Sequence, residues 1–362
     1  MPEPFASSRT RFYHRGRYAI WHALRALGLG PGSNVAFPAF HCGAELIPFR
    51  QAGVGLRYYR LSRSLQADLD SIEGAIDPQT KAVFVTHCLG FPQQIRDIQQ
   101  LCRERGLPLI EDCAHTLNGW SGDRMLGTFG DVAIFSMRKL LPMPHGAALC
   151  INTPSVPLPE APRPPPLTGT VGDMAFKVGR HLADRNSKLG SIARTWIARP
   201  AARALEGCRG VTRGSERRPD SPLFRTDHLD RGMSGLSERI LRTSDLEQVR
   251  QRRRRNFERL LAGLTATGPA EPLLPELPDG VCPLMFPLFA DQAEDLVGHL
   301  RHHGIQSDLY WRYFDPGFPE HDFPEEADLK RRLLTLPVHQ ELDDAALDRM
   351  VGAVRSWTGP RS

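Results

Sequence analysis

Residues 106–152 read GLPLIEDCAHTLNGWSGDRMLGTFGDVAIFSMRKLLPMPHGAALCIN and contain three apolar runs of strand length. The runs span 107–110, 132–135 and 147–151, and each is bounded by Gly, Pro or charged residues. Short continuous apolar runs are typical of strands that are buried on both faces of a parallel sheet. We therefore predict an α/β protein whose mostly parallel central sheet, flanked by helices in three layers, passes through this stretch.

Polar residues follow the first two runs. Glu111 and Asp112 come after the first, and Ser136 comes after the second, with Lys139 three residues further on. Because ligands of open α/β sheets bind outside the carboxyl ends of the strands, we expect a carboxylate, a hydroxyl and an amine at one edge. This set suits pyridoxal 5′-phosphate (PLP), which needs an amine for its aldehyde, a carboxylate for its ring nitrogen and donors for its phosphate. Of the five lysines, only Lys139 follows this pattern, whereas Lys330 lies among arginines in a segment expected to be exposed.

Length and composition set limits on the class of protein. A chain of 362 residues, 41% hydrophobic and 24% charged, has room for two lobes and is typical of a globular protein. No apolar run approaches the ~20 residues of a membrane span, and the N-terminal residues lack an apolar signal core. The seven cysteines contain no CxxC pair, which argues against a disulfide framework or a zinc site. We expect a cytoplasmic protein without an integral membrane segment or a metal.

Apolar spacing and stop signals predict further elements before the central stretch. Helices are expected over 16–28 and 93–105, and strands over 35–38, 56–60 and 82–87. Gly16 and Arg17 begin the first helix, where free backbone N–H groups can bind a phosphate. Phe40 and His41 follow a strand and are candidates to lie against a planar ring. His87 ends its strand at the same edge as Asp112, where it either contacts substrate or bonds to the backbone.

The second half of the chain divides into a variable segment and a smaller unit. Residues 153–229 begin Pro-rich and continue with a basic helical stretch over 171–205, which covers protein or lies on a membrane surface. One long helix is expected over 237–264. It contains the run RQRRRR (250–255), and because no aromatic platform accompanies this run, we interpret it as a solvated face and expect no nucleic acid partner. A small α+β unit follows, with strands over 284–289, 305–310 and 333–337 and helices over 292–303 and 343–357. We place the domain boundary between residues 235 and 236.

In this order, several stretches resemble the DegT/StrS-type aminotransferases, which have the fold of type I PLP-dependent transferases. They are GRYAIWHALRALGLGPGSNVAFPAF, AVFVTHCLGFP, GLPLIEDCAH, GTFGDVAIFSMRK, PHGAAL and LLTLPVHQELDDAALDRMV. The resemblance covers nearly the whole chain except 153–229.

The resemblance implies roles for individual residues. Lys139 would be the Schiff-base lysine, Asp112 the partner of the pyridine nitrogen, and His115 the residue beside the ring hydroxyl. Ser136 would bind the phosphate, together with Gly16 and Arg17. Because Cys42 takes the place of the usual stacking aromatic, His41 or Phe40 would cover the ring instead.

The resemblance also implies a reaction and partners. The amino group would pass from a donor, glutamate, through pyridoxamine 5′-phosphate to a keto sugar linked to a nucleotide, in a homodimer. In the small unit, Tyr310, Trp311, Arg312 and His339 would be substrate contacts. The family motif Asn-x-Arg-Met, which reaches the partner's site, is Asp230-Arg231-Gly232-Met233 here. Three alternatives remain open: another PLP reaction such as dehydration, against which Lys139 argues, a substrate other than a sugar, and a non-catalytic regulator with this fold.

Overall fold

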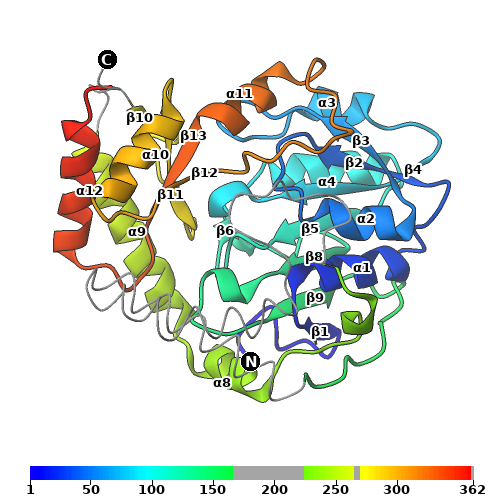
Figure 1. Cartoon of the computed structure of the whole chain (residues 1–362). Coiled ribbons are helices and arrows are strands. Elements are labelled where there is room, and N and C mark those ends of the chain that lie inside the picture. The colour runs from blue at the N-terminus through cyan, green and yellow to red at the C-terminus, as the bar shows by residue number, and fades with distance from the viewer. Residues whose placement is uncertain (166–223, 265–269, 360–362) are drawn as a thin grey trace.

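The computed structural model describes residues 1–165, 224–264 and 270–359, and these residues form two sheets with their helices (Figure 1). The larger sheet has seven strands in the order β1-β9-β8-β5-β4-β2-β3. These strands are β1 (Thr10–Tyr13), β2 (Asn34–Pro38), β3 (Gly55–Tyr59), β4 (Thr80–Thr86), β5 (Leu109–Cys113), β8 (Val132–Phe135) and β9 (Ala147–Ile151). The smaller sheet has the order β10-β11-β13-β12, with β10 (Ala270–Pro272), β11 (Met285–Ala290), β12 (Asp308–Leu309) and β13 (Leu333–Pro337). The predicted α/β architecture with a smaller C-terminal α+β unit is confirmed.

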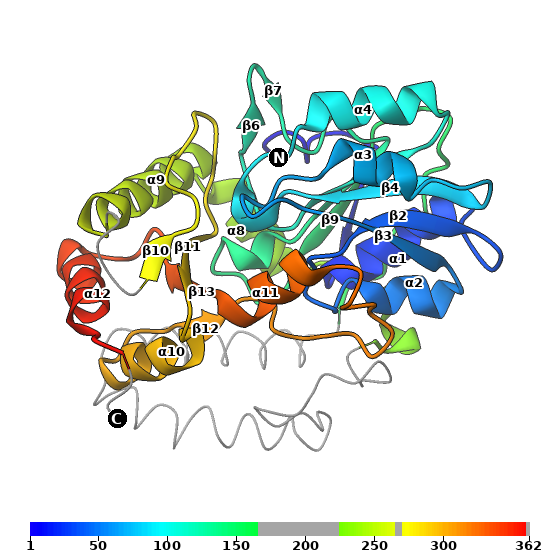
Figure 2. The same cartoon turned by 90° about the horizontal axis from the view of Figure 1, so that it is seen from above.

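Helices cover both faces of the large sheet. They are α1 (Gly16–Ala26), α2 (Leu46–Ala52), α3 (Leu69–Gly74) and α4 (Ile95–Glu104). Seen from above, α1 and α2 lie on one side and α3 and α4 on the other (Figure 2). Alternate residues of β4 separate accordingly, since Ala82 and Phe84 belong to the core under α1 and α2, whereas Val83 and Val85 belong to the opposite core. A strand buried on both faces therefore appears as a continuous apolar run in the sequence.

One prediction about the large sheet is wrong in direction. Strand β9 occupies the predicted residues 147–151, but it runs antiparallel to β8, and β1 runs antiparallel to β9. The connection between β8 and β9 contains only the 3₁₀ turn η2 (Met137–Lys139). A parallel return needs a crossover of a dozen or more residues, usually with a helix, and this connection is too short to provide one.

The long helix predicted over 237–264 is two helices, α8 (Gly235–Thr243) and α9 (Leu246–Gly263). Ser244 is extended and ends α8. Asp245 then caps α9, because its Oδ1 accepts a hydrogen bond of 2.9 Å from Gln248 N. The break turns the chain from the large sheet toward the small one (Figure 1).

The small sheet packs against α9, α10 (Ala293–His302) and α11 (Pro324–Arg332), and α12 (Asp344–Ser356) packs against α9 and α10. Most strands and helices of this small unit match the predicted ones. No pattern predicted β10 or α11, and the 305–310 strand shortens to β12. Lys330 lies in α11 and is fully buried, so the expectation that it is exposed was wrong. Backbone carbonyls from segments far away in the sequence surround its ammonium group, and no local pattern reveals them.

A short hairpin of β6 (Trp120–Ser121) and β7 (Arg124–Met125) and the 3₁₀ turns η1 (Cys88–Gly90) and η4 (Thr226–His228) complete the described elements. None of the helices in the described ranges has the length and apolarity needed to cross a membrane.

The basic stretch 171–205 lies outside the described residues, as does most of the variable segment. The domain boundary stays a prediction, although α8 begins at Gly235, next to it.

Candidate active site

The carboxyl ends of β5 and β8 bring three of the predicted site residues to one edge of the large sheet. The two strands are neighbours, with Asp112 opposite Ile134, so Asp112 lies on the same face as Ser136, which comes two residues further along. Ser136 precedes η2, and Lys139 N donates a hydrogen bond of 3.0 Å to Ser136 O. In a 3₁₀ turn, side chains at positions i and i+3 are eclipsed, so Ser136 and Lys139 point to the same side. The unusual three-residue spacing is therefore compatible with one site.

The N-terminus of α1 lies beside Ser136. A Cβ atom placed on Gly16 would be 3.9 Å from Ser136 Cβ, so the hydroxyl and the first helical N–H groups are close neighbours. Unpaired N–H groups and the helix dipole favour an anion at such a terminus. Arg17 lies in the first turn of the same helix. Two segments that are 120 residues apart thus form one candidate phosphate site.

Asp112 is a buried carboxylate that accepts few hydrogen bonds. Its Oδ1 accepts a hydrogen bond of 2.8 Å from Ala114 N. Burial raises the pKa of Asp112 to about 6, although the nearby Lys139 ammonium and the Ala114 N–H group lower it. The Lys139 side chain itself is exposed. A carboxylate that lacks solvation and lies near an amine is typical of a functional site, because a cationic ligand group can complete its pairing.

His115 follows β5 and is held by two elements. Leu89 N lies 3.3 Å from His115 Nδ1, and the Tyr310 hydroxyl lies 3.4 Å from the same nitrogen. Burial, followed by the positive charge of Lys139, lowers the pKa of His115 well below its usual value. His115 is therefore neutral at physiological pH and can accept or donate a hydrogen bond beside Asp112.

Three aromatic residues from both sheets pack beside His115, and we call them the aromatic wall: Phe40, Tyr310 and Trp311. The Trp311 ring centroid lies 5.0 Å from Phe40, 4.8 Å from Tyr310 and 5.2 Å from His115. The backbone of Trp311 has a φ of 56°, in the left-handed region that a bulky residue rarely adopts. Such strain is often found at functional sites.

The structure does not support a ring-covering role for His41. Its side chain is fully buried, stacks on Tyr58 at 5.7 Å, and contacts Phe37 and Phe318. Neither ring nitrogen has a hydrogen-bond partner among the described residues. Because successive residues of an extended segment point to opposite sides, His41 faces this second aromatic cluster while Phe40 faces the wall.

His87 is also enclosed, and its contacts favour the structural alternative over the substrate contact. Its Nδ1 accepts a hydrogen bond of 3.1 Å from Gln93 N, which places the proton on Nε2, and Nε2 donates to Glu111 Oε1 at 3.0 Å. The side chain has no exposed surface. The alternative that His87 is structural fits these contacts.

Glu111, His87 and Cys113 bring a carboxylate, an imidazole and a thiol together in the core. The carboxylate accepts hydrogen bonds from His87 Nε2 and from the N–H groups of Gly127, Phe129 and Gly130. Burial raises the pKa of Glu111, but these bonds outweigh it and the net shift is downward. The cluster anchors the 127–130 loop that leads into β8, and we assign it no ligand.

The substrate candidates of the small unit lie in different places. Arg312 is on the surface, where its Nη1 lies 3.4 Å from Glu294 Oε1, so the structure favours a surface ion pair. His339 precedes Gln340, whose Nε2 donates a hydrogen bond of 3.0 Å to Leu140 O, next to Lys139. His339 and Tyr310 therefore remain near the site, and Arg312 does not contact it in this chain.

Arg253 is a buried residue that the sequence interpretation missed. It belongs to the run 250–255, yet it is buried and donates to Gln340 Oε1 at 3.0 Å and to the carbonyls of Pro283 and Leu284 at 3.1 Å. It thereby orients the Gln340 amide toward Leu140. A signal was present, since Arg253 stands four residues after Val249 and four before Phe257, on the apolar face of α9.

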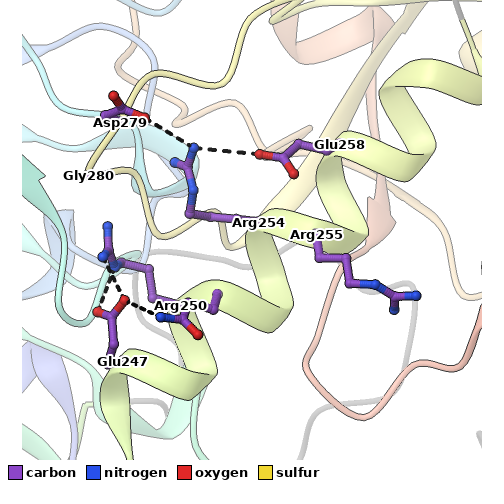
Figure 3. Close-up of a pocket in the computed structure, with 8 residues that line it drawn as sticks. Glu247, Arg250, Arg254, Arg255, Glu258, Asp279 and Gly280 are labelled. Atoms are coloured by element: carbon purple, nitrogen blue, oxygen red, sulfur yellow. Dashed lines mark hydrogen bonds and ion pairs between the residues drawn. The ribbon is translucent and has the colours of Figure 1, made fainter.

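Three other arginines of this run, Arg250, Arg254 and Arg255, line a groove of about 440 Å³ (Figure 3). Arg250 pairs with Glu247, Arg254 pairs with Glu258 and Asp279, and Arg255 points away from them. Positive and negative charges are balanced there. The interpretation of these three arginines as a solvated face therefore agrees with the structure.

The residues at the edge of the large sheet fit PLP. A buried carboxylate with few donors can pair with a ring nitrogen that carries a proton. An exposed lysine can reach an aldehyde, and the space beside Gly16 and Ser136 is lined by donors suited to a phosphate. This donor set is the one that a PLP-dependent transferase needs.

The chain belongs to the DegT/DnrJ/EryC1/StrS aminotransferase family, whose model matches residues 14–154 and 240–355. It is therefore an aminotransferase, and the aminotransferases of this family use PLP. The residues between the two matches include most of the predicted variable segment. Both lobes of the molecule consequently belong to the family fold.

Similar proteins agree with this assignment. The dTDP-4-dehydro-2,3,6-trideoxy-D-glucose 4-aminotransferase of Saccharopolyspora spinosa is 27% identical over 92% of this chain and 80% of its own length. The GDP-perosamine synthase of Vibrio cholerae is 35% identical over 33% of each chain. Among solved structures, the aminotransferase TlmJ from Streptoalloteichus hindustanus has a TM-score of 0.67, with 22% identity, and the match covers 96% of this chain and 85% of that one. The PLP form of a sugar aminotransferase from Streptococcus pneumoniae also has a TM-score of 0.67, at 16% identity, over 96% and 86% of the two chains. These two likenesses show the fold.

Residues 230–233, which stand in place of the family motif that reaches the partner's site, pair with the end of β1 in their own chain. Gly232 bridges to Tyr13, Met233 N donates to Phe12 O at 3.3 Å, and His14 N donates to Arg231 O at 2.9 Å. The backbone of residues 231–233 thus extends the edge of the large sheet.

Proposed function

We propose that this aminotransferase binds PLP at the edge of the large sheet and transfers an amino group from glutamate to a keto sugar linked to a nucleotide. The observation that carries the proposal is the convergence of Asp112, Ser136 and Lys139 beside the N-terminus of α1. When bound, the cofactor supplies an electron-accepting ring and an aldehyde that carries the amino group.

Each residue has a distinct part in this proposal. Asp112 holds the proton on the ring nitrogen, and Lys139 bonds covalently to the cofactor and moves a proton to and from the substrate carbon. Ser136, with the N–H groups at Gly16 and the side chain of Arg17, binds the phosphate. His115 lies beside the ring. Tyr310 and His339 line the approach of the substrate.

Two features support the acceptor and the assembly. Three of the relatives are named for dTDP-, GDP- and UDP-linked sugars, so a nucleotide-linked keto sugar is the acceptor class that we propose. We further propose a homodimer, because the exposed side chain of Lys139 leaves one side of the site to be covered by a second subunit. Sedimentation of the purified protein tests the assembly.

Cofactor titration tests the chemistry. Purified protein mixed with PLP is expected to gain a near-visible absorbance band, and borohydride reduction should fix the cofactor on the peptide that contains Lys139. Lys139→Ala should lose the band, whereas Lys81→Ala should keep it, because Lys81 is exposed and its ammonium group donates to Pro78 O at 3.0 Å. Glutamate should convert the band, and a panel of nucleotide-linked keto sugars should restore it.

The outcomes separate the alternatives. A protein that binds PLP through Lys139 but does not respond to amino donors would perform another reaction or act as a regulator. Conversion by glutamate without recovery by any keto sugar would point to an acceptor of another class. A chain that takes up no PLP at all contradicts the proposal.

A further inference from the structure

The buried Lys330 connects the two sheets beside the proposed cofactor site. Its ammonium group donates hydrogen bonds to three backbone carbonyls: His41 O at 2.6 Å, Tyr313 O at 3.1 Å and Trp311 O at 3.2 Å. The first belongs to the segment between β2 and α2, and the other two belong to the loop after β12. The side chain has no exposed surface.

An ammonium group matches this position. It is a compact charge with three donors that point in different directions, and three carbonyl oxygens use all of them. The Phe40 ring adds a cation–π contact, with Nζ 5.4 Å from its centroid. Burial lowers the pKa of Lys330 to about 8, so the protonated form with three donors still predominates at neutral pH.

The carbonyls that Lys330 holds belong to the aromatic wall or to its immediate neighbours. Trp311 belongs to the wall and has the strained backbone, and His41 follows Phe40 directly. Tyr313 packs against Gly43, where a Cβ atom would meet the tyrosine ring at 2.4 Å, so the two loops fit closely. Removing the cation would deprive one buried carbonyl and two partly buried ones of this donor and would let the backbone at Trp311 relax.

We propose that Lys330 is a positioning residue that fixes the aromatic wall of Phe40, Tyr310 and Trp311 against His115, so that the wall borders the cofactor ring. The inference rests on the proposed cofactor site. It also accounts for the absence of an aromatic residue at position 42, because the wall supplies the ring contact from the loop after β12. Lys330 acts through backbone carbonyls and does not take part in proton transfer.

The test uses Lys330→Met, which keeps the length of the side chain and removes the charge, and the matched control Lys81→Met. We expect Lys330→Met to bind PLP at least about tenfold more weakly, the size expected when hydrogen bonds to a charged donor are lost. Lys81→Met should bind PLP like the wild type. Lys330→Arg should fall between them, since a planar guanidinium keeps the charge but cannot point its donors at three separate oxygens.

A second readout needs no cofactor. The difference between the fluorescence spectra of the wild type and Trp311→Phe isolates the Trp311 indole. In the Lys330→Met background this difference should shift to longer wavelength, because the released indole meets water. Thermal unfolding of the same variants shows whether they are folded.

Three results decide the proposal. If folded Lys330→Met binds PLP with wild-type affinity and keeps the Trp311 spectrum, the inference is overturned. If the wild type binds no PLP, the proposed function fails, and the Trp311 spectrum still tests the positioning of the wall. If Lys330→Met does not fold, Lys330→Arg, which keeps the charge, serves for both measurements. Folded Lys330→Arg with wild-type PLP affinity and a wild-type Trp311 spectrum then contradicts the proposal.

Discussion

Glu111 and Asp112 are neighbours on β5, yet their carboxylates lie on opposite faces of the sheet and in opposite environments. Glu111 faces the α4 side and accepts hydrogen bonds from His87 and from three backbone N–H groups. Among the described residues, the Asp112 carboxylate accepts one hydrogen bond, from Ala114 N.

The pKa values of the two carboxyls show what this difference means. Burial raises the pKa in both cases, but the bonds to Glu111 reverse the shift, whereas the pKa of Asp112 remains raised to about 6. A carboxylate with all its donors stabilises the fold. One that lacks donors destabilises the free protein and is available to a ligand.

The largest expected effect comes from removing the buried carboxylate of Glu111, which accepts hydrogen bonds from four N–H groups. Glu111→Ala should lower the free energy of unfolding by about 3–5 kcal/mol, because it leaves buried N–H groups and His87 without an acceptor. Denaturant titration of the cofactor-free protein measures the loss. Glu111→Gln keeps one acceptor oxygen and should lose less, so equal stability of Glu111→Ala and the wild type would remove the contrast.

Asp112→Asn should change stability in the opposite direction. The folded pKa of Asp112 is raised above its unfolded value, so the favourable contribution is present below pH 3.8 and is lost as the pH rises through about 6. At pH 8 the ionised carboxylate therefore destabilises the cofactor-free protein by on the order of 3 kcal/mol, at about 1.4 kcal/mol per pKa unit. Asp112→Asn should recover most of this, and the gain should disappear below pH 4.

The same substitution should reduce transamination by about 100-fold or more, because the ring nitrogen loses its charged partner. Unfolding curves at several pH values and steady-state rates measure the two effects on one variant. A loss of stability at pH 8 would show that Asp112 is structural like Glu111.

The smallest effect is expected at His87, which supports Glu111 without contacting substrate. His87→Leu should lower the free energy of unfolding by about 1.5–3 kcal/mol, the range for a hydrogen bond to a charged group. The KM values for amino donor and acceptor should stay unchanged. A raised KM with unchanged stability would restore the substrate contact that the sequence suggested for His87.

The sequence predicted the edge of the sheet that carries the site well, because the reactive polar residues come directly after apolar runs of strand length. Residues 132–135 and 147–151 are the strands β8 and β9, and Asp112 near the end of β5 lies at the same edge as Ser136 after β8, as expected. The direction of β9 could not be predicted from its composition, since a doubly buried strand has the same pattern in either direction. The direction of β9 depends on the length of the segment between β8 and β9, and this length can be counted in the sequence.

The remaining misses concern residues whose surroundings come from distant segments. His41 and Phe40 are adjacent candidates, and only the packing of Tyr58 and Phe318 shows which one faces the site. Lys330 looks like an ordinary surface cation, because its carbonyl partners lie far away in sequence, whereas the position of Arg253 on the apolar face of α9 was a local signal of its burial. The break between α8 and α9 was recognisable, because Asp245 stands three residues before Gln248 in the order of a helix cap.

Strand β1 pairs with β9, and Thr10 and Cys150 are 140 residues apart. During synthesis the first strand must wait until β9 has left the ribosome, so the edge of the sheet closes late in folding. Trimming the first 13 residues would leave β9 with unpaired backbone groups along one side. Such an open edge invites pairing with another chain, so shortened versions of this protein should aggregate more readily than the full one.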